Sequence, residues 1–321
     1  MDYVILTKLA SYTGAGIAIG FGAIGAAVGE GYTAAEATKA IGRHPDRAGE
    51  VVKTMLIGQA IAESASIFAL VVAMLLLFSK FPGHSYITAC ALIGASLSMG
   101  LGAIGSGIGS GLPAGAACQG MVRQPAMAGK ITTNMLVGSA VCQTPSIFSL
   151  VIAFILMFTN FANKPAAPLW AALLGAGLAT GLSAIGSGIG SGFAAQAGCE
   201  GVARHPKASA ITNVMLLGQA IAQTPAILGL LIAFLLIFKR FPETFELAPA
   251  MALLSAGFCM GVGGIGPGIG EGYAAAGGTR WVGRNESRVA EITRTMLVGM
   301  AVAESTAVYA MVVSLVLIFV V

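Results

Sequence analysis

The chain has 321 residues, of which 56% are hydrophobic and only 9% are charged, and its mean hydropathy is +0.87. Soluble domains carry about 25% charged residues, so this composition excludes an ordinary soluble protein and indicates an integral membrane protein. The net charge of +4 is small and gives no indication of nucleic-acid binding. The apolar runs exceed the ~20 residues that a spanning helix needs, and they lack the alternation of a β-barrel.

A repeat of about 80 residues organises the chain. Arg43, Arg123, Arg204 and Arg284 recur at intervals of 80 or 81 residues, each in a short polar turn between two apolar runs. This period predicts four tandem helical hairpins, and therefore an all-α membrane protein with eight transmembrane helices. We expect the hairpins to occupy residues 1–80, 81–162, 163–241 and 242–321.

The turns within the hairpins and the connectors between them differ in charge. Twelve of the 17 Lys and Arg residues lie in or beside the four turns, which predicts that the turns face the cytoplasm, although Lys239 and Arg240 at the other end weaken the bias. The connectors at 81–84, 160–168 and 239–246 contain proline, which ends helices. Because these connectors are short, neighbouring helices should be antiparallel.

The first helix of each hairpin is rich in glycine, at 16–31, 100–111, 181–192 and 261–272. Small residues at this spacing let helix backbones approach closely within a membrane. Gly20, Gly22 and Gly25 also satisfy the GxGxxG nucleotide-binding pattern, but the run lies within a span and follows no strand. The second helices carry large apolar residues, as at 70–78 and 311–319, which suits an outer layer facing lipid.

Two second helices place a carboxylate in the middle of an apolar span, at Glu63 and Glu304. An ionisable group at that depth costs several kcal/mol, roughly 3 on insertion scales, so it indicates a functional site with a partner. Glu30 lies 33 residues before Glu63, and Glu271 lies 33 residues before Glu304. Each pair is centred on a turn, so the two acids should face each other at about the same depth.

The other two hairpins lack both acids. Gln143 and Gln223 stand at the positions of Glu63 and Glu304, and Ser110 and Ser191 stand at the positions of Glu30 and Glu271. An amide cannot balance the charge of an ion, so these two hairpins should be ion-silent. The five cysteines are scattered without metal-ligand spacing, and we interpret them as small buried hydrophobic residues.

A glycine-rich first helix, an Arg-containing turn and a mid-membrane acid together resemble the rotor-ring proteolipid, or c-ring component, of F-type ATP synthases. Residues 266–275 and 301–309 are similar to the form found in sodium-driven rotors, and the fusion of hairpins with loss of acids is similar to the proteolipids of V-type ATPases. The resemblance covers nearly the whole chain four times. It implies a homo-oligomeric ring with glycine helices inside and acid-bearing helices outside.

The resemblance also implies roles for individual residues. In hairpin four, Glu304 would carry the ion and Glu271 would be the second carboxylate of its site. The Ser305 hydroxyl and the Val302 carbonyl would be ion ligands at an interface between hairpins, and Tyr309 would hydrogen-bond the carboxylate. In hairpin one, the matching residues are Glu63, Glu30, Ser64 and Ile61, but Phe68 replaces the tyrosine. Two carboxylates around one monovalent cation would leave a net negative charge, so one shared proton should remain.

Two features of the silent hairpins leave alternatives open. Pro145 and Pro225 lack the amide that would bond the carbonyls of Val141 and Ile221, at the positions matching Val302. These prolines are either tolerated kinks, or they free a carbonyl that a silent hairpin lends, together with Thr144 or Thr224, to a neighbouring ion. Gln59 and Gln219 either line a site or hydrogen-bond between hairpins.

The predicted function is that of a non-catalytic rotor-ring subunit of a rotary ATPase in the bacterial plasma (inner) membrane. It would translocate Na+ or H+ without a cofactor, and few acids per ring favour an ATP-driven pump. Its partners would be copies of itself, a stator subunit bearing an essential arginine, central-stalk subunits and lipid. The turn residues that would dock the stalk are Arg43, His44, Arg123, Gln124, Arg204, His205 and Arg284.

Three alternatives differ from this interpretation. A proton-specific ring of an ATP synthase would use the same carboxylates without a sodium site. A passive channel would need a continuous polar path, yet each hairpin offers polar groups at one depth. A purely structural ring would not need the four buried acids.

Overall fold

The computed structural model of the chain describes residues 3–81, 85–161, 167–244 and 246–320. Parts of all three expected connectors lie outside these ranges. The described residues contain eight helical segments that are long and apolar enough to cross a membrane. The prediction of four hairpins and eight spans is therefore confirmed, and the chain is a multi-pass membrane protein.

Each hairpin has a long first helix and a second helix that returns beside it. The first helices are α1 (Tyr3–Arg43), α3 (Tyr86–Arg123), α6 (Leu169–Arg204) and α9 (Leu247–Arg284). The second helices of the outer hairpins are continuous, as α2 (Ala48–Phe78) and α10 (Val289–Val320). Those of the middle hairpins are split, into α4 (Ala128–Cys142) with α5 (Thr144–Phe158) and α7 (Ile211–Ala222) with α8 (Thr224–Phe238). Short 3₁₀ turns at Pro45–Arg47, Pro125–Met127 and Glu286–Arg288 join the two helices within hairpins one, two and four.

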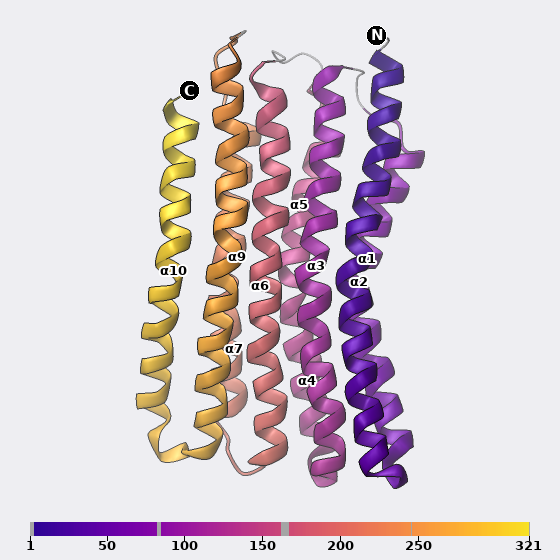
Figure 1. The fold of residues 1–321 in the computed structure, drawn as a ribbon, viewed down its shortest axis with the longest axis vertical. Helices are drawn as coiled ribbons and strands as arrows, with labels where there is room; N and C mark the ends of the chain where they lie inside the picture. The colour runs from indigo at the N-terminus through magenta and orange to yellow at the C-terminus, as the bar shows by residue number, and fades with distance from the viewer. Residues whose placement is uncertain (1–2, 82–84, 162–166, 245, 321) are drawn as a thin grey trace.

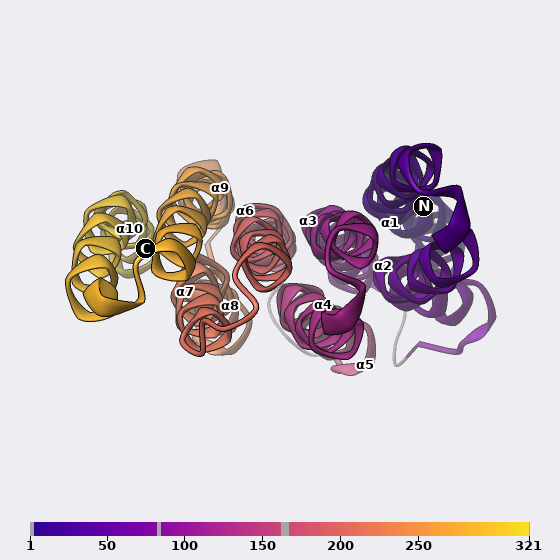
Figure 2. The same cartoon turned by 90° about the horizontal axis from the view of Figure 1, so that it is seen from below.

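The helices form two layers. Helices α1, α3, α6 and α9 lie side by side in one row, and α2, α4, α5, α7 and α8 lie in a second row behind it (Figures 1 and 2). Helix α2 packs between α1 and α3, and the split helices pack in the next two intervals. Helix α10 contacts α9, α8 and α7 but has no following hairpin beside it, and it stands at one end of the row (Figure 2).

Glycine allows the first helices to touch backbone to backbone. A Cβ atom on Gly25 would collide with the carbonyl oxygen of Ile104, and one on Gly105 would collide with that of Ile185. A Cβ atom on Gly188 would collide with the backbone of Gly105 itself. Lipid removes the hydrophobic drive between helices, so this close packing is a main source of their association.

The two split helices break at the position where the other hairpins carry an acid. Pro145 and Pro225 have no backbone N–H, so they cannot continue the helical hydrogen bonds. The amide after each proline donates to a serine of the first helix, and Ala226 N also donates to the Gln223 carbonyl at 3.1 Å. Ser146 N donates to the Ser106 hydroxyl at 3.2 Å, and Ala226 N donates to the Ser187 hydroxyl at 3.1 Å. A serine of the first helix therefore seals each break.

We predict that Gly188→Ala lowers the free energy of unfolding by about 1–3 kcal/mol, because overpacking would push α6 away from α3. Gly42→Ala is the matched control, since a Cβ atom at Gly42 meets nothing within 4 Å. The measurement is unfolding of the detergent-solubilised chain by sodium dodecyl sulfate. Equal stability of the two variants would contradict the assignment of the glycine contacts as a main source of helix association.

Candidate ion-binding sites

The structure brings the two predicted pairs of acids together. Glu63 on α2 and Glu30 on α1 interact electrostatically, as do Glu304 on α10 and Glu271 on α9. The pairs differ in their surroundings. Glu63 is exposed and Glu30 is half-buried, whereas Glu304 is half-buried and Glu271 is fully buried.

Glu271 is a buried acid without a compensating group. Its side chain is 0% exposed, and neither carboxylate oxygen has a hydrogen-bond partner among the residues that the structure describes. An isolated carboxylate in such surroundings is strongly unfavourable unless it is protonated or paired with a cation. The site on hairpin four therefore has a chemical requirement that a proton or a cation would meet.

Gln143 bridges two neighbouring hairpins. Its Nε2 atom donates to the Ser110 hydroxyl at 2.7 Å within its own hairpin and to the backbone carbonyl of Ile61 at 3.0 Å in the preceding one. The Ser146 hydroxyl contacts its Oε1 atom at 3.4 Å. The side chain is 7% exposed, so these contacts lie away from lipid and water.

Gln223 repeats the contact one hairpin further along. Its Nε2 atom donates to the backbone carbonyl of Val141 at 2.9 Å, and the side chain is 8% exposed. Ile61 and Val141 each lie two residues before the acid position of their own hairpin. Each of these two glutamines thus bonds to a carbonyl of the preceding hairpin. That carbonyl lies two residues before the preceding hairpin's acid position.

Hydroxyl groups gather at the same carbonyl positions. Ser64 Oγ donates to the Ile61 carbonyl at 2.6 Å, Thr224 Oγ1 to the Ile221 carbonyl at 2.8 Å, and Ser305 Oγ to the Val302 carbonyl at 2.7 Å. Oxygen atoms therefore accumulate at one level of each of these second helices. The corresponding carbonyl of hairpin four lies on the terminal helix α10, where Val302 and Tyr309 are 68% and 66% exposed.

Gln59 and Gln219, four residues before the acid positions of hairpins one and three, form hydrogen bonds to backbone groups. Gln59 donates to the Glu30 carbonyl at 3.2 Å, within its own hairpin. Gln219 donates to the Gly138 carbonyl at 2.9 Å and to the Ser191 carbonyl at 3.1 Å, and so links hairpin three to hairpin two.

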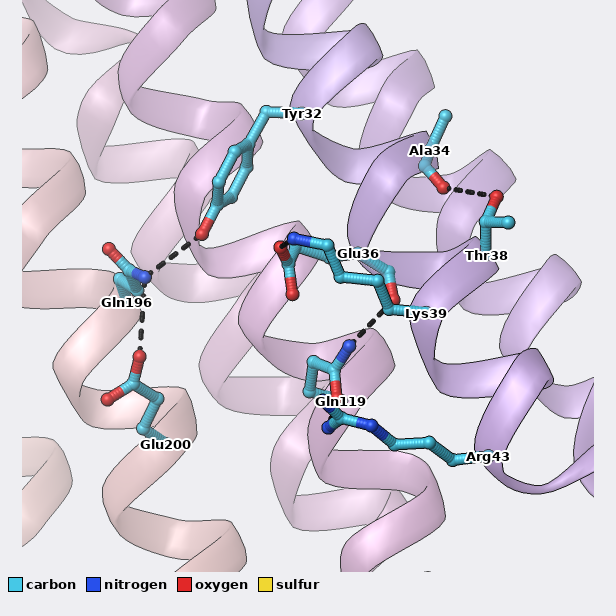
Figure 3. Close-up of polar contacts among 9 residues, drawn as sticks. All are labelled: Tyr32, Ala34, Glu36, Thr38, Lys39, Arg43, Gln119, Gln196 and Glu200. Atoms are coloured by element: carbon cyan, nitrogen blue, oxygen red, sulfur yellow. Dashed lines mark hydrogen bonds and ion pairs between the residues drawn. The ribbon is translucent and has the colours of Figure 1, made fainter.

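The polar turns present exposed arginines at one end of the bundle. Arg43, Arg123, Arg204 and Arg284 are the last residues of their helices, and all are exposed. His44 is exposed, whereas Gln124 and His205 are half-buried. Arg43 donates to Gln119 at 3.3 Å, and Gln119 in turn donates to the Glu36 carbonyl at 2.9 Å (Figure 3).

Near the turns, a polar network links the first helices α1, α6 and α9. Gln196 on α6 donates to the Tyr32 hydroxyl on α1 at 3.1 Å and to Glu200 at 3.3 Å (Figure 3). Glu200 also pairs with Arg280 on α9 at 3.3 Å. Sequence reasoning missed this network and the sealing serines Ser106 and Ser187. The spacing of Glu200 and Arg280, which lie at matching positions of consecutive repeats, was the available signal for the ion pair.

Comparison with known proteins assigns the repeat to a family. The family model of the ATP synthase C subunit matches residues 13–76, 93–156, 174–236 and 254–317, one match in each hairpin. The ATP synthase c protein of Natranaerobius thermophilus is 47% identical over 80 residues, which are 25% of this chain and 92% of that protein. The A-type ATP synthase K protein of Methanocaldococcus jannaschii is 32% identical over 185 residues, which are 58% of this chain and 77% of that protein. The chain therefore belongs to the family of the ATP synthase C subunit, as a rotary-ATPase proteolipid with four hairpins of that family joined in tandem.

Proposed function

We propose that copies of this chain form a closed rotor ring that moves Na+ across a membrane on Glu63 and Glu304. Partner subunits would couple that movement to ATP hydrolysis or synthesis. The main supporting observation is the fully buried, unpartnered Glu271 carboxylate beside Glu304, because a transported cation or proton would supply what it lacks. The ring itself takes no part in the chemistry of ATP.

An incomplete series of contacts supports the closure of copies into a ring. Along the row, a glycine of each first helix lies against the carbonyl of an isoleucine in the next helix: Gly25 with Ile104, Gly105 with Ile185, and Gly186 with Ile265. The fourth glycine, Gly266, has nothing within 4 Å of a Cβ position, and the matching Ile24 is 46% exposed at the other end of the row. Ile24 of a second copy would complete the series, so the same contact repeats between chains.

The contacts of Gln143 and Gln223 indicate which oxygens would complete each ion site. The same relation between consecutive hairpins pairs Glu304 with the Ile221 carbonyl and the Thr224 hydroxyl within one chain. It pairs Glu63 with groups of the preceding copy in the ring, namely the Val302 carbonyl, Ser305 and Tyr309. Exposure of Val302 and Tyr309 on the free face of α10 agrees with this role.

The groups available at both sites are oxygen atoms, which suit a hard cation such as Na+. Two carboxylates, a carbonyl and a hydroxyl would surround the ion, and one proton shared by the carboxylates would keep the site neutral. A proton-specific ring is the second candidate, since the same acids can be discharged by protons alone. The tyrosine and the paired acids favour sodium.

The exposed turns and the small number of acids support proposals about further partners and about the direction of operation. The exposed turn arginines would contact central-stalk subunits, and a stator subunit would supply the cation that displaces the bound ion. Two acid-bearing hairpins in four give few ions per turn, which favours an ATP-driven pump. The Lys and Arg bias supports a cytoplasmic location of the turns in a bacterial plasma membrane.

We predict that a carboxyl-reactive carbodiimide labels Glu63 and Glu304 of the purified ring and that Na+ suppresses both reactions. Only a protonated carboxyl that the reagent can reach reacts, and a bound Na+ would occupy the carboxylate oxygens of Glu63 and Glu304 and so block the reaction there. The measurement is mass spectrometry of peptides after labelling with and without Na+. If Na+ does not change the labelling, the transported ion is H+ and not Na+. The absence of labelling at both residues would contradict ion transport at these sites.

Pro225→Ala tests the ligand set proposed for Glu304. Alanine restores an N–H that can bond the Ile221 carbonyl, so Na+ protection of Glu304 should weaken by about fivefold, or ~1 kcal/mol. Pro145→Ala is the matched control, because the Val141 carbonyl already accepts from Gln223 and lies at no acid site. Equal effects of the two variants on Glu304, measured as Na+-dependent labelling, would contradict the assignment.

A further inference from the structure

The amide nitrogen of Gln143 lies among oxygens that correspond to cation ligands. Nε2 is 2.7 Å from the Ser110 hydroxyl and 3.0 Å from the Ile61 carbonyl. Ser110 stands at the position of Glu271, and Ile61 stands at the position of Ile221, the carbonyl proposed for the site of Glu304. The amide nitrogen therefore lies between two oxygens whose positions match the Ile221 carbonyl and Glu271, the groups proposed to surround an ion at Glu304.

Gln223 supplies a second and separate example. Its nitrogen is 2.9 Å from the Val141 carbonyl, which lies on α4, whereas Ile61 lies on α2. Both glutamine side chains are more than nine-tenths buried. A buried amide that found its partner by chance would not be expected to select the equivalent carbonyl in two consecutive interfaces.

Charge balance makes the substitution chemically consistent. A carboxylate with a bound Na+ is neutral and offers an electropositive centre to surrounding oxygens. A carboxamide is also neutral, and its NH₂ group offers two donors at the end of a side chain of the same length. Gln143 thus satisfies a carbonyl and a hydroxyl oxygen, and Gln223 satisfies a carbonyl, whereas Ser191 Oγ has no hydrogen-bond partner among the described residues.

We propose that the Gln143 and Gln223 amides act as built-in substitutes for the cation and hold hairpins two and three permanently in the ion-loaded arrangement. This inference rests on the proposed ion transport at Glu63 and Glu304. Two of every four hairpins would then cross the lipid as neutral units that neither bind nor release an ion. A hairpin with an empty carboxylate could not do so without the cost of exposing a charge to lipid.

The decisive variant is Gln143→Glu, which replaces the amide by a carboxylate beside the same oxygens. It should create a third cation-dependent site, so that Na+ at about ten times its dissociation constant slows carbodiimide labelling at position 143 by about tenfold. The thermal unfolding midpoint of the ring should also depend more strongly on Na+ than that of the unmodified ring.

Ile147→Glu is the matched control for Gln143→Glu. Ile147 lies four residues further along, on α5, and is 44% exposed, whereas Gln143 is 7% exposed, so a carboxylate at position 147 would not be buried among the ligand oxygens. Its labelling should not respond to Na+. The reverse exchange, Glu304→Gln, should leave the ring assembled and remove the part of its Na+-dependent stabilisation that comes from hairpin four.

The outcomes separate this inference from the proposed function. If Na+ protects Glu63 and Glu304 but leaves position 143 of Gln143→Glu as reactive as position 147 of the control, transport stands and the substitute role is wrong. If the native acids respond to pH but not to Na+, the ring is a proton rotor. The inference then requires the stability of Gln143→Glu to depend on pH more strongly than that of the unmodified ring and of Ile147→Glu, and the absence of this difference would overturn the inference.

Discussion

The close approach of glycine backbones sets the spacing of the helices throughout the bundle. Gly25, Gly105 and Gly186 each let one first helix lie against the carbonyl of the next, so the row has a single repeated spacing. The second helices pack in the intervals between first helices and inherit this spacing. A side chain on one second helix can consequently reach a backbone oxygen on its neighbour, as Gln143 and Gln223 do.

The four hairpins use one geometry for two kinds of chemistry. In the middle of the chain, an amide links consecutive hairpins by direct hydrogen bonds, and proline with a sealing serine reshapes the backbone beside it. At the ends of the chain, the helices run unbroken through Glu63 and Glu304. A carboxylate cannot donate to a carbonyl, so the acid-bearing hairpins need a proton or a cation where the middle hairpins have their own nitrogen.

In a ring built from one kind of chain, this order would give an uneven rotor. Hairpin four of one copy would adjoin hairpin one of the next, so acids would occur as neighbours separated by two amide hairpins. Each elementary charge moved across 100 mV is worth about 2.3 kcal/mol. Halving the charges per turn lets the hydrolysis of each ATP move its ions against a steeper gradient. The two sites would also differ, because one would be closed within a chain and the other between chains.

The membrane class, the four hairpins and the matched depth of the acids could all be predicted from the sequence, because hydropathy, an 80-residue period and a 33-residue separation are linear properties. Close glycine packing was predictable too, since small residues at helical spacing let helices associate in lipid. The bond from Gln143 to Ile61, the contact of Gln196 with Tyr32 and the burial of Glu271 without a partner emerged only from the tertiary structure. These relations join residues of different helices, and their geometry depends on the rotation and offset of neighbouring helices, which no single-helix pattern specifies.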